Sequence, residues 1–509
     1  MNFLRDRLSR LAALFLLVVF TEIPVLVSHF YWSMVDPDIW WHLRVGGWIL
    51  HFHELPKVGL FSRYAEGHAW VAYSWGFEVL MASLFRIWGL AAIPMTLAVF
   101  RAVIVFTLFL VMIRLTNRFW ISWLLTAATI FAIAGILVIR PVLFTVLFFT
   151  IAIGLIFEAR RTASIRPLYW FPPLMLLWSN IHIQFVYGLG LLGLFVICEL
   201  LRSLVKSDMA AWVSSRPVNT PAFRLLMVLL VSILVTLIGP NWGNVYLVIF
   251  RYAQNTSQYN QIAELVALTF RNASDYSVVF LLMGACFALG KKRPDLFTTS
   301  LLVISAMVSF RAGRDAWFVC LVACGIIAES VGRDQETTFS VPTSWRLQYA
   351  AAFLVAIIAA FGYANSVGLT PANLIEPVDR NYPVRATEYI RSHHLEGPMY
   401  NSFNWGGFLI FNLREYPVSI DGRNDFYGSV LFDRMQNTVN GVNWRSDPDL
   451  EASKFVILEK TQPLVTLLSV EPGYTLAYSD HVAAVFVKTT VQREPMAGSL
   501  PGPTIKPLH

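Results

Sequence analysis

The chain has 509 residues, of which 56% are hydrophobic and 14% are charged, and its mean hydropathy is +0.57. Roughly a quarter of the residues of soluble domains are charged, so this composition excludes an ordinary soluble enzyme. The net charge of +7 is expected of a membrane protein whose Lys and Arg residues gather in cytoplasmic loops. We therefore expect a chain that lies mostly in a membrane and does not bind nucleic acid.

The N-terminal segment MNFLRDRLSR carries three arginines ahead of an apolar run at 11–30. This run can cross the roughly 30 Å hydrocarbon core, which predicts a cytoplasmic N-terminus and a first membrane span. Ten further runs bring the expected number to about eleven spans. They lie at 90–114, 119–138, 142–158, 168–186, 188–205, 222–239, 277–290, 297–310, 315–330 and 348–366.

Alternating these spans across the membrane places the basic loops on the cytoplasmic side, including 158–167 and 331–346. If the segment 74–89 also crossed, the basic loop 158–167 would face outward. A total of thirteen spans is the alternative count. We therefore predict a first extracytoplasmic loop at 31–89 that contains interfacial helices. The transmembrane part is expected to cover 1–370.

Residues 371–492 contain more charge than the rest of the chain and predict a small extracytoplasmic α/β domain. Short β-like runs are expected at 398–403, 416–421, 455–460, 474–479 and 482–488. Helical stretches are expected near 382–394, 428–439 and 461–470. The final residues, 493–509, are rich in Pro and Gly and predict a disordered tail.

Two aspartates follow the first span in the motif Asp36-Pro37-Asp38, and His42 comes four residues after the second. The apolar and tryptophan residues from Asp38 to His53 predict a helix that lies along the interface. Asp38 can cap that helix, and the tryptophans can form an interfacial belt. Acidic residues at the mouth of a lipid-embedded cavity also favour a chemical role.

Further polar residues lie at the external ends of predicted spans, namely Arg140, Asn180, His182, Arg311 and Arg314. Each arginine alone can extend to lipid headgroups. Together with the aspartates they predict a site for an anion, most naturally a phosphate linked to a lipid. In such a site the arginines stabilise a leaving phosphate and an aspartate accepts a proton from the acceptor.

Several motifs resemble the GT-C superfamily, membrane glycosyltransferases that use polyprenyl-phosphate sugars, and within it a set of bacterial membrane proteins. The similar segments are DPDIWWHLRVGGWIL, HAWVAYSWGFEVL, IRPVLF, LLWSNIHIQFVYG, NSFNWGGFLIF and YPVSIDGRNDFYG. The resemblance implies a general base at Asp36 or Asp38. It also leaves open whether these aspartates and His42 bind a divalent cation, Mg²⁺ or Mn²⁺.

In the tail, Asn404 and Trp405 precede a predicted short helix, and Asp421 and Arg423 follow an apolar strand. These residues can bind the acceptor or cover the active site. Alternatively, Asp421 and Arg423 form an internal pair that stabilises the loop.

The leading hypothesis is therefore a membrane glycosyltransferase of the bacterial inner membrane. It moves a sugar, hexosyl or pentosyl, from a polyprenyl-phosphate donor to a glycan, lipid or protein acceptor on the extracytoplasmic face. One alternative is a transporter or lipid-handling protein, because polar residues within a membrane also mark substrate paths. The other is a scaffold whose external domain binds a partner.

Overall fold

The computed structural model describes residues 9–17, 30–64, 68–205, 207–254, 266–291, 294–332 and 371–489, with the single positions 351, 354, 355, 358 and 362. The predicted spans at 11–30 and 348–366, the loop at 331–346 and the tail at 493–509 lie wholly or largely outside these residues.

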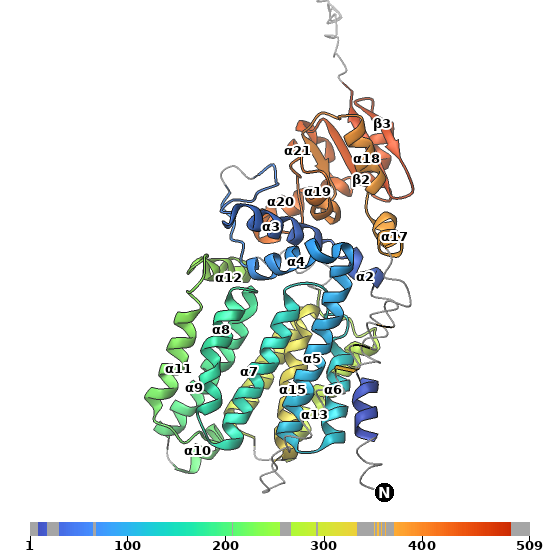
Figure 1. The fold of residues 1–509 in the computed structure, drawn as a ribbon. Coiled ribbons are helices and arrows are strands. Elements are labelled where there is room, and N and C mark those ends of the chain that lie inside the picture. Colours follow the sequence, from blue (N-terminus) through green and yellow to red (C-terminus); the bar gives the residue numbers. More distant parts are fainter. Residues whose placement is uncertain are drawn as a thin grey trace, which may run out of the picture.

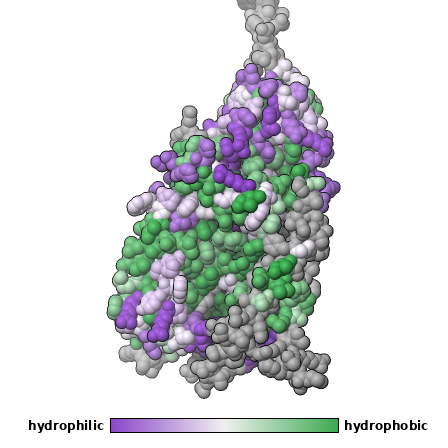
Figure 2. Space-filling view, viewed as in Figure 1, coloured by the Kyte–Doolittle hydropathy of each residue, from purple (hydrophilic) through white to green (hydrophobic). Residues whose placement is uncertain are grey.

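The described chain forms a helical bundle with a smaller domain at one end (Figure 1). Figure 2 shows an apolar surface over the bundle and a hydrophilic surface over the smaller domain. The helices of the bundle are α5 (Ala92–Thr116), α6 (Phe119–Ile133), α7 (Val142–Thr162), α8 (Phe171–Ser179), α9 (Val186–Leu204), α11 (Ala222–Val235), α13 (Ala273–Lys291), α14 (Leu296–Arg311) and α15 (Ala316–Gly332). This division between the two surfaces confirms a membrane protein with an additional hydrophilic domain.

Five helical stretches among the described residues are long and apolar enough to cross a membrane. They are Trp75–Thr116, Val142–Thr162, Ile183–Leu204, Ala273–Lys291 and Gly313–Gly332. Three further predicted spans correspond to shorter apolar helices, α6, α11 and α14. The predicted span at 168–186 is not one helix, because α8 has nine residues and ends at Ser179, where the chain turns.

Two helices, α3 (Asp38–Phe52) and α4 (Trp75–Trp88), lie between the bundle and the smaller domain (Figure 1). They pack against each other with almost no space at Gly46. A Cβ atom at that position would lie 2.0 Å from the backbone oxygen of Glu78. The close approach of α3 and α4 therefore depends on a residue without a side chain at Gly46.

Gly46→Ala is expected to push α3 away from α4 and to lower the free energy of unfolding by about 1–3 kcal/mol, the usual range for overpacking. The neighbouring variant Gly47→Ala is the matched control, because a Cβ there meets no atom within 4 Å. Thermal unfolding of both variants in detergent measures the difference. Equal midpoints for the two variants would contradict the close contact.

At the opposite end of the bundle, a buried ion-pair cluster joins three helices. The Arg160 guanidinium on α7 donates to Asp295 at 2.7 Å and to Glu329 at 2.9 Å. All three side chains are buried, and Asp295 also caps α14 by accepting from the Thr298 amide. A buried charge must be paired, so this cluster holds α7, α14 and α15 in one arrangement.

The smaller domain confirms the predicted α/β segment near the C-terminus. Its four-stranded sheet has the order β1-β2-β4-β3, with β1 parallel to β2 and the other neighbours antiparallel. The strands are β1 (Met399–Asn401), β2 (Phe455–Glu459), β3 (Tyr474–Ser479) and β4 (Ala483–Lys488). The helices are α17 (Pro371–Asn381), α18 (Val384–Ser392), α19 (Gly406–Asn412), α20 (Asn424–Val439), α21 (Pro448–Ala452) and α22 (Pro463–Val470).

The predicted strand at 416–421 is absent from this sheet. Val418 instead makes one parallel bridge with Ser62 of the loop between α3 and α4. Pro417 has no amide hydrogen to give to a ladder, which weakens this segment as a strand. The segment therefore connects the small domain to the loop that precedes α4.

The small domain packs directly against the end of α2 and the start of α3. Tyr382 donates its hydroxyl to the backbone oxygen of Val35 at 2.7 Å, at the end of α2 (Phe30–Val35). Trp40 packs edge-on against Tyr382 and Phe408, and α19 lies against α3. This contact places the loop before α20 over the beginning of α3.

Candidate functional site

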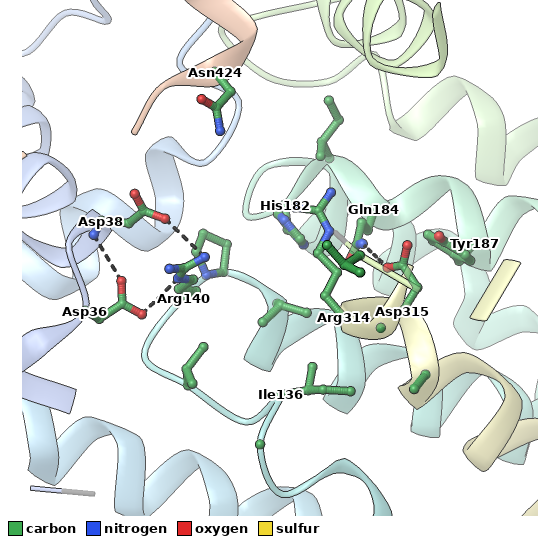
Figure 3. Close-up of a pocket in the computed structure, with 18 of the residues that line it drawn as sticks. Asp36, Asp38, Ile136, Arg140, His182, Gln184, Tyr187, Arg314, Asp315 and Asn424 are labelled. Atoms are coloured by element: carbon green, nitrogen blue, oxygen red, sulfur yellow. Dashed lines mark hydrogen bonds and ion pairs between the residues drawn. The ribbon is translucent and has the colours of Figure 1, made fainter. Parts of the chain in front are cut away.

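A cavity of about 600 Å³ lies where the end of the bundle, the start of α3 and the small domain meet. We call it the central cavity. Figure 3 shows its polar residues, which come from segments far apart in the sequence. The polar residues that line the cavity include Asp36, Asp38, His42, Arg140, His182, Gln184, Tyr187, Asp275, Arg314, Asp315 and Asn424, and Gly422 also lines it.

One wall holds both predicted aspartates and Arg140 in a single cluster. Arg140 Nε donates to Asp36 Oδ2 at 2.8 Å, and Arg140 Nη1 lies 3.2 Å from Asp38 Oδ2. Trp41 Nε1 donates to Asp38 Oδ1 at 3.1 Å. Asp36, Asp38 and Arg140 therefore lie together in the lining of this cavity.

The backbone explains why the two carboxylates lie together. Asp36 Oδ1 accepts the amide of Asp38 at 3.0 Å, so Asp36 satisfies an early amide of α3. Pro37 fixes its own backbone angle immediately before this helix, and acidic groups are stabilised near a helix N-terminus. Asp38 is the first residue of α3 and does not cap it, because its carboxylate is turned towards Arg140 and Trp41.

The opposite wall contains a second arginine with polar neighbours (Figure 3). Arg314 and Asp315 lie in a 3₁₀ turn, η7 (Gly313–Asp315), between α14 and α15. Gln184 donates to Asp315 at 3.0 Å, and His182 Nδ1 lies 2.7 Å from the Thr145 hydroxyl. The cavity therefore has an arginine next to acidic side chains on each of two walls, and His182 lies beside Arg314 on the second wall (Figure 3).

His42 lines the cavity but pairs with Glu78 of α4, at 3.3 Å from Nδ1 to Oε1. Burial, together with the charges of Arg140 and His182, holds the pKa of His42 well below its usual value, which keeps the imidazole neutral. Arg140 lies between the two aspartates, where a cation would have to bind. The described residues contain no group of three metal-binding side chains, so the set of Asp36, Asp38 and His42 does not fit Mg²⁺ or Mn²⁺.

Two other predicted residues do not line the central cavity. Asn180 makes structural bonds, accepting from Trp75 Nε1 at 3.1 Å and donating to the backbone oxygen of Ile238 at 2.9 Å. Arg311 is exposed at the end of α14, although Arg314 follows it by only three residues. The turn after α14 directs these two arginines to different places, which spacing along the sequence does not reveal.

The predicted residues of the small domain also have structural partners. Asn404 donates to Glu459 at 3.2 Å, and the buried Trp405 donates to the backbone oxygen of Asn381 at 3.0 Å. Arg423 donates twice to Asp421, at 2.8 and 2.7 Å, and both side chains are fully buried. The alternative of an internal Asp421–Arg423 pair therefore describes this loop.

The same loop nevertheless covers the cavity through two residues that the sequence did not single out, Gly422 and Asn424. A Cβ at Gly422 would lie 2.1 Å from Asp38 Oδ1. Figure 3 shows Asn424 above the Asp38 and Arg140 wall. In the sequence, these two residues are marked only by their position beside Asp421 and Arg423. The contact with Asp38 joins segments almost four hundred residues apart, so no local pattern indicates it.

Gly422→Ala is expected to displace the Asp38 carboxylate, which Arg140 and Trp41 otherwise hold in place. If Asp38 acts in the reaction, the activity should fall by about 10²-fold, the scale of a misplacement near 1 Å. Gly473→Ala is the control in the same domain, because its Cβ would meet no atom within 4 Å. Unaltered turnover in Gly422→Ala would show that the loop does not position Asp38.

Asp425, next to this loop, is expected to make stability depend on pH. Burial raises its pKa to about 6, although the nearby Arg423 charge opposes the shift. Because the folded state favours the protonated acid, the stability that Asp425 contributes is present below about pH 4 and is lost as the pH rises through about 6. Asp425→Asn should therefore raise the free energy of unfolding at pH 8 by up to about 3 kcal/mol and leave it little changed at pH 4. Thermal unfolding at the two pH values tests this, and an equal effect at both would contradict it.

Comparisons with known proteins identify the class of fold. The structure is similar to the crystal structure of the apo oligosaccharyltransferase of Archaeoglobus fulgidus, with a TM-score of 0.54 and 12% identity over 89% of this chain and 69% of that one. It also matches ArnT from Cupriavidus metallidurans bound to undecaprenyl phosphate, with a TM-score of 0.48 and 13% identity over 93% and 98% of the two chains. No protein-family model and no curated protein matches the sequence. The similarity to the oligosaccharyltransferase shows that this chain shares its fold, and a GT-C fold is what the resemblance of the motifs implied.

Proposed function

We propose that this protein is a membrane glycosyltransferase that takes a sugar from a polyprenyl-phosphate donor. The observation that carries the proposal is the central cavity, where Asp36 and Asp38 share Arg140 and a second arginine, Arg314, lies across the space. The GT-C fold supports the same class of reaction. Such a transfer requires one group that neutralises the phosphate and another that accepts a proton.

In this proposal Asp38 is the general base. Its side chain is 19% exposed, compared with 7% for Asp36, so Asp38 is more accessible from the cavity. Asp36 holds Arg140 and the first turn of α3. Arg140 and Arg314 bind the donor phosphate, and the sugar passes to the acceptor oxygen or nitrogen as the bond between the sugar and the phosphate breaks. Arg311 has no part in this proposal, because it lies outside the cavity lining.

The proposed topology follows the sequence. The N-terminus is cytoplasmic, about eleven spans cross the bacterial inner membrane, and the central cavity and the small domain face the extracytoplasmic side. The ion-pair cluster of Arg160 then lies at the cytoplasmic end of the bundle. The small domain covers the cavity with Gly422 and Asn424, which border the space where donor and acceptor meet.

The direct test uses the purified full chain in lipid with radiolabelled polyprenyl-phosphate hexoses and pentoses and a membrane extract as the source of acceptor. Transfer of label to a glycan, lipid or protein is expected. The absence of transfer from every donor, together with flux of labelled donor across proteoliposomes, would favour the alternative of a lipid-handling protein without catalysis.

A further inference from the structure

A second cavity lies beside the central cavity, at the end of α3 and against α12 (Asn244–Gln254). We call it the interfacial cleft; it has a volume of about 900 Å³. Its apolar walls come from α3, α4, α12 and the loop between α3 and α4, and include Ile49, Leu55, Val71, Val79 and Val248. A space of this size with walls of this kind can hold part of a lipid.

The interfacial cleft and the central cavity lie on different sides of the same chain segments. Trp70, Val71 and Trp75 line the cleft, whereas Tyr73 and Ser74 from the same segment line the central cavity. On α12, Val248 and Ile249 divide in the same way. The cleft is therefore a separate space, and it does not extend the site described above.

The rim of the cleft carries more positive than negative charge. Lys57 follows α3 and Arg251 lies in the last turn of α12, and both are exposed. Neither forms an ion pair within the part of the chain that the structure describes. Glu54 is the one carboxylate among the lining residues. This balance of charge favours an anion, and a Lys and an Arg that line the same cleft from two segments can bind a phosphate.

Exposed apolar side chains lie on α12 and just before it, and one of them, Leu247, lines the cleft. Trp242 is 72% exposed, and Leu247 and Phe250 on α12 are 57% and 62% exposed. α12 lies at the end of the bundle next to α4, where the apolar surface meets the hydrophilic domain (Figures 1 and 2). A helix with exposed apolar residues at such a boundary lies in the headgroup region of a bilayer.

We infer that the interfacial cleft binds the phosphate headgroup of an anionic membrane phospholipid. The phosphate lies between Lys57 and Arg251, and the acyl chains run past Leu247 into the bilayer. The inference is independent of the glycosyltransferase proposal, because it concerns a different cavity and requires no reaction.

The test measures lipid retention by native mass spectrometry of the purified full chain, titrated with phosphatidylglycerol and with zwitterionic phosphatidylcholine. Phosphatidylglycerol should bind more tightly, and Lys57→Gln/Arg251→Gln should weaken its binding about tenfold, since each basic residue near an anionic headgroup adds attraction. The control Arg86→Gln/Arg414→Gln removes two exposed arginines that line neither cavity and should bind as the unaltered protein does. Thermal unfolding confirms that each variant is folded.

Two further measurements distinguish the binding of a lipid from the binding of a free anion. Leu247→Ser should weaken phosphatidylglycerol binding, because it removes an apolar contact in the lining of the cleft. Inorganic phosphate should not displace the lipid at equal concentration. The inference is overturned if both lipids bind equally to all variants, if the two double variants lose the same affinity, or if inorganic phosphate competes as well as the lipid does.

Discussion

Replacing Asp38 by asparagine should reduce sugar transfer by about 10²–10⁴-fold in kcat, the usual contribution of a general base. Asparagine keeps the size of the side chain and its contact with Trp41 Nε1, so the loss would report the missing proton acceptor. Asp36→Asn should also lower the activity, because it weakens the bond from Arg140 and the contact with the first turn of α3. Transfer assays at saturating donor measure both effects.

The control is Asp379→Asn, which removes a partly exposed aspartate that pairs with the exposed Arg385 in the small domain. It should leave kcat unchanged, since exposed ion pairs contribute little to stability. The assignment of Asp38 would be wrong if Asp38→Asn kept full activity, or if Asp36→Asn alone abolished it while Asp38→Asn did not.

Arg423→Met should destabilise the small domain by about 3–5 kcal/mol, the range for removing one partner of a buried ion pair. The Asp421 carboxylate is fully buried, and without Arg423 it keeps only the Tyr427 hydroxyl at 2.5 Å and the amide of residue 423. Although burial alone would lower the pKa of Arg423, Asp421 raises it above its ordinary value, so the guanidinium stays charged. Arg423 also lies over the Trp70 ring, at 5.0 Å, which ties the domain to the loop before α4.

Thermal unfolding in detergent measures this effect. Arg385→Met is the matched control, because it breaks an exposed pair and should cost at most about 1 kcal/mol. The double variant Arg423→Met/Asp421→Leu should recover part of the lost stability, since it removes the unpaired charge. Equal losses for Arg423→Met and Arg385→Met would contradict the stabilising role of the buried pair.

The two parts of the molecule could be predicted because each depends on local composition. A run of apolar residues dissolves in lipid whatever it packs against, and alternating short strands with helices indicate a water-soluble α/β segment. The predicted strand at 416–421 was wrong because its pattern resembles a strand, whereas its partner, Ser62, lies in another part of the chain. The length of an apolar run also predicted the length of its helix poorly, because the run at 168–186 contains the short helix α8.

Some of the residues that line the central cavity can be recognised in the sequence for the same reason. Asp36, Asp38, Arg140, His182 and Arg314 each stand out locally, because charged and polar residues are rare in an apolar chain, and all five line the central cavity. Asn180 and Arg311 stand out equally in the sequence and do not line it. Chemical type alone therefore cannot distinguish a residue that faces a cavity from one that connects two helices.

The sequence by itself determined that this chain lies in a membrane, that acids and arginines occur at one end of its helices, and that an α/β domain follows. These properties depend on burial in lipid and on the spacing of residues within single elements. Only the tertiary structure decided that one arginine, Arg140, binds both aspartates, that His42 pairs with Glu78, and that Gly422 lies against Asp38. Each of these contacts joins separate elements, so it forms only once the helices and the small domain have packed together.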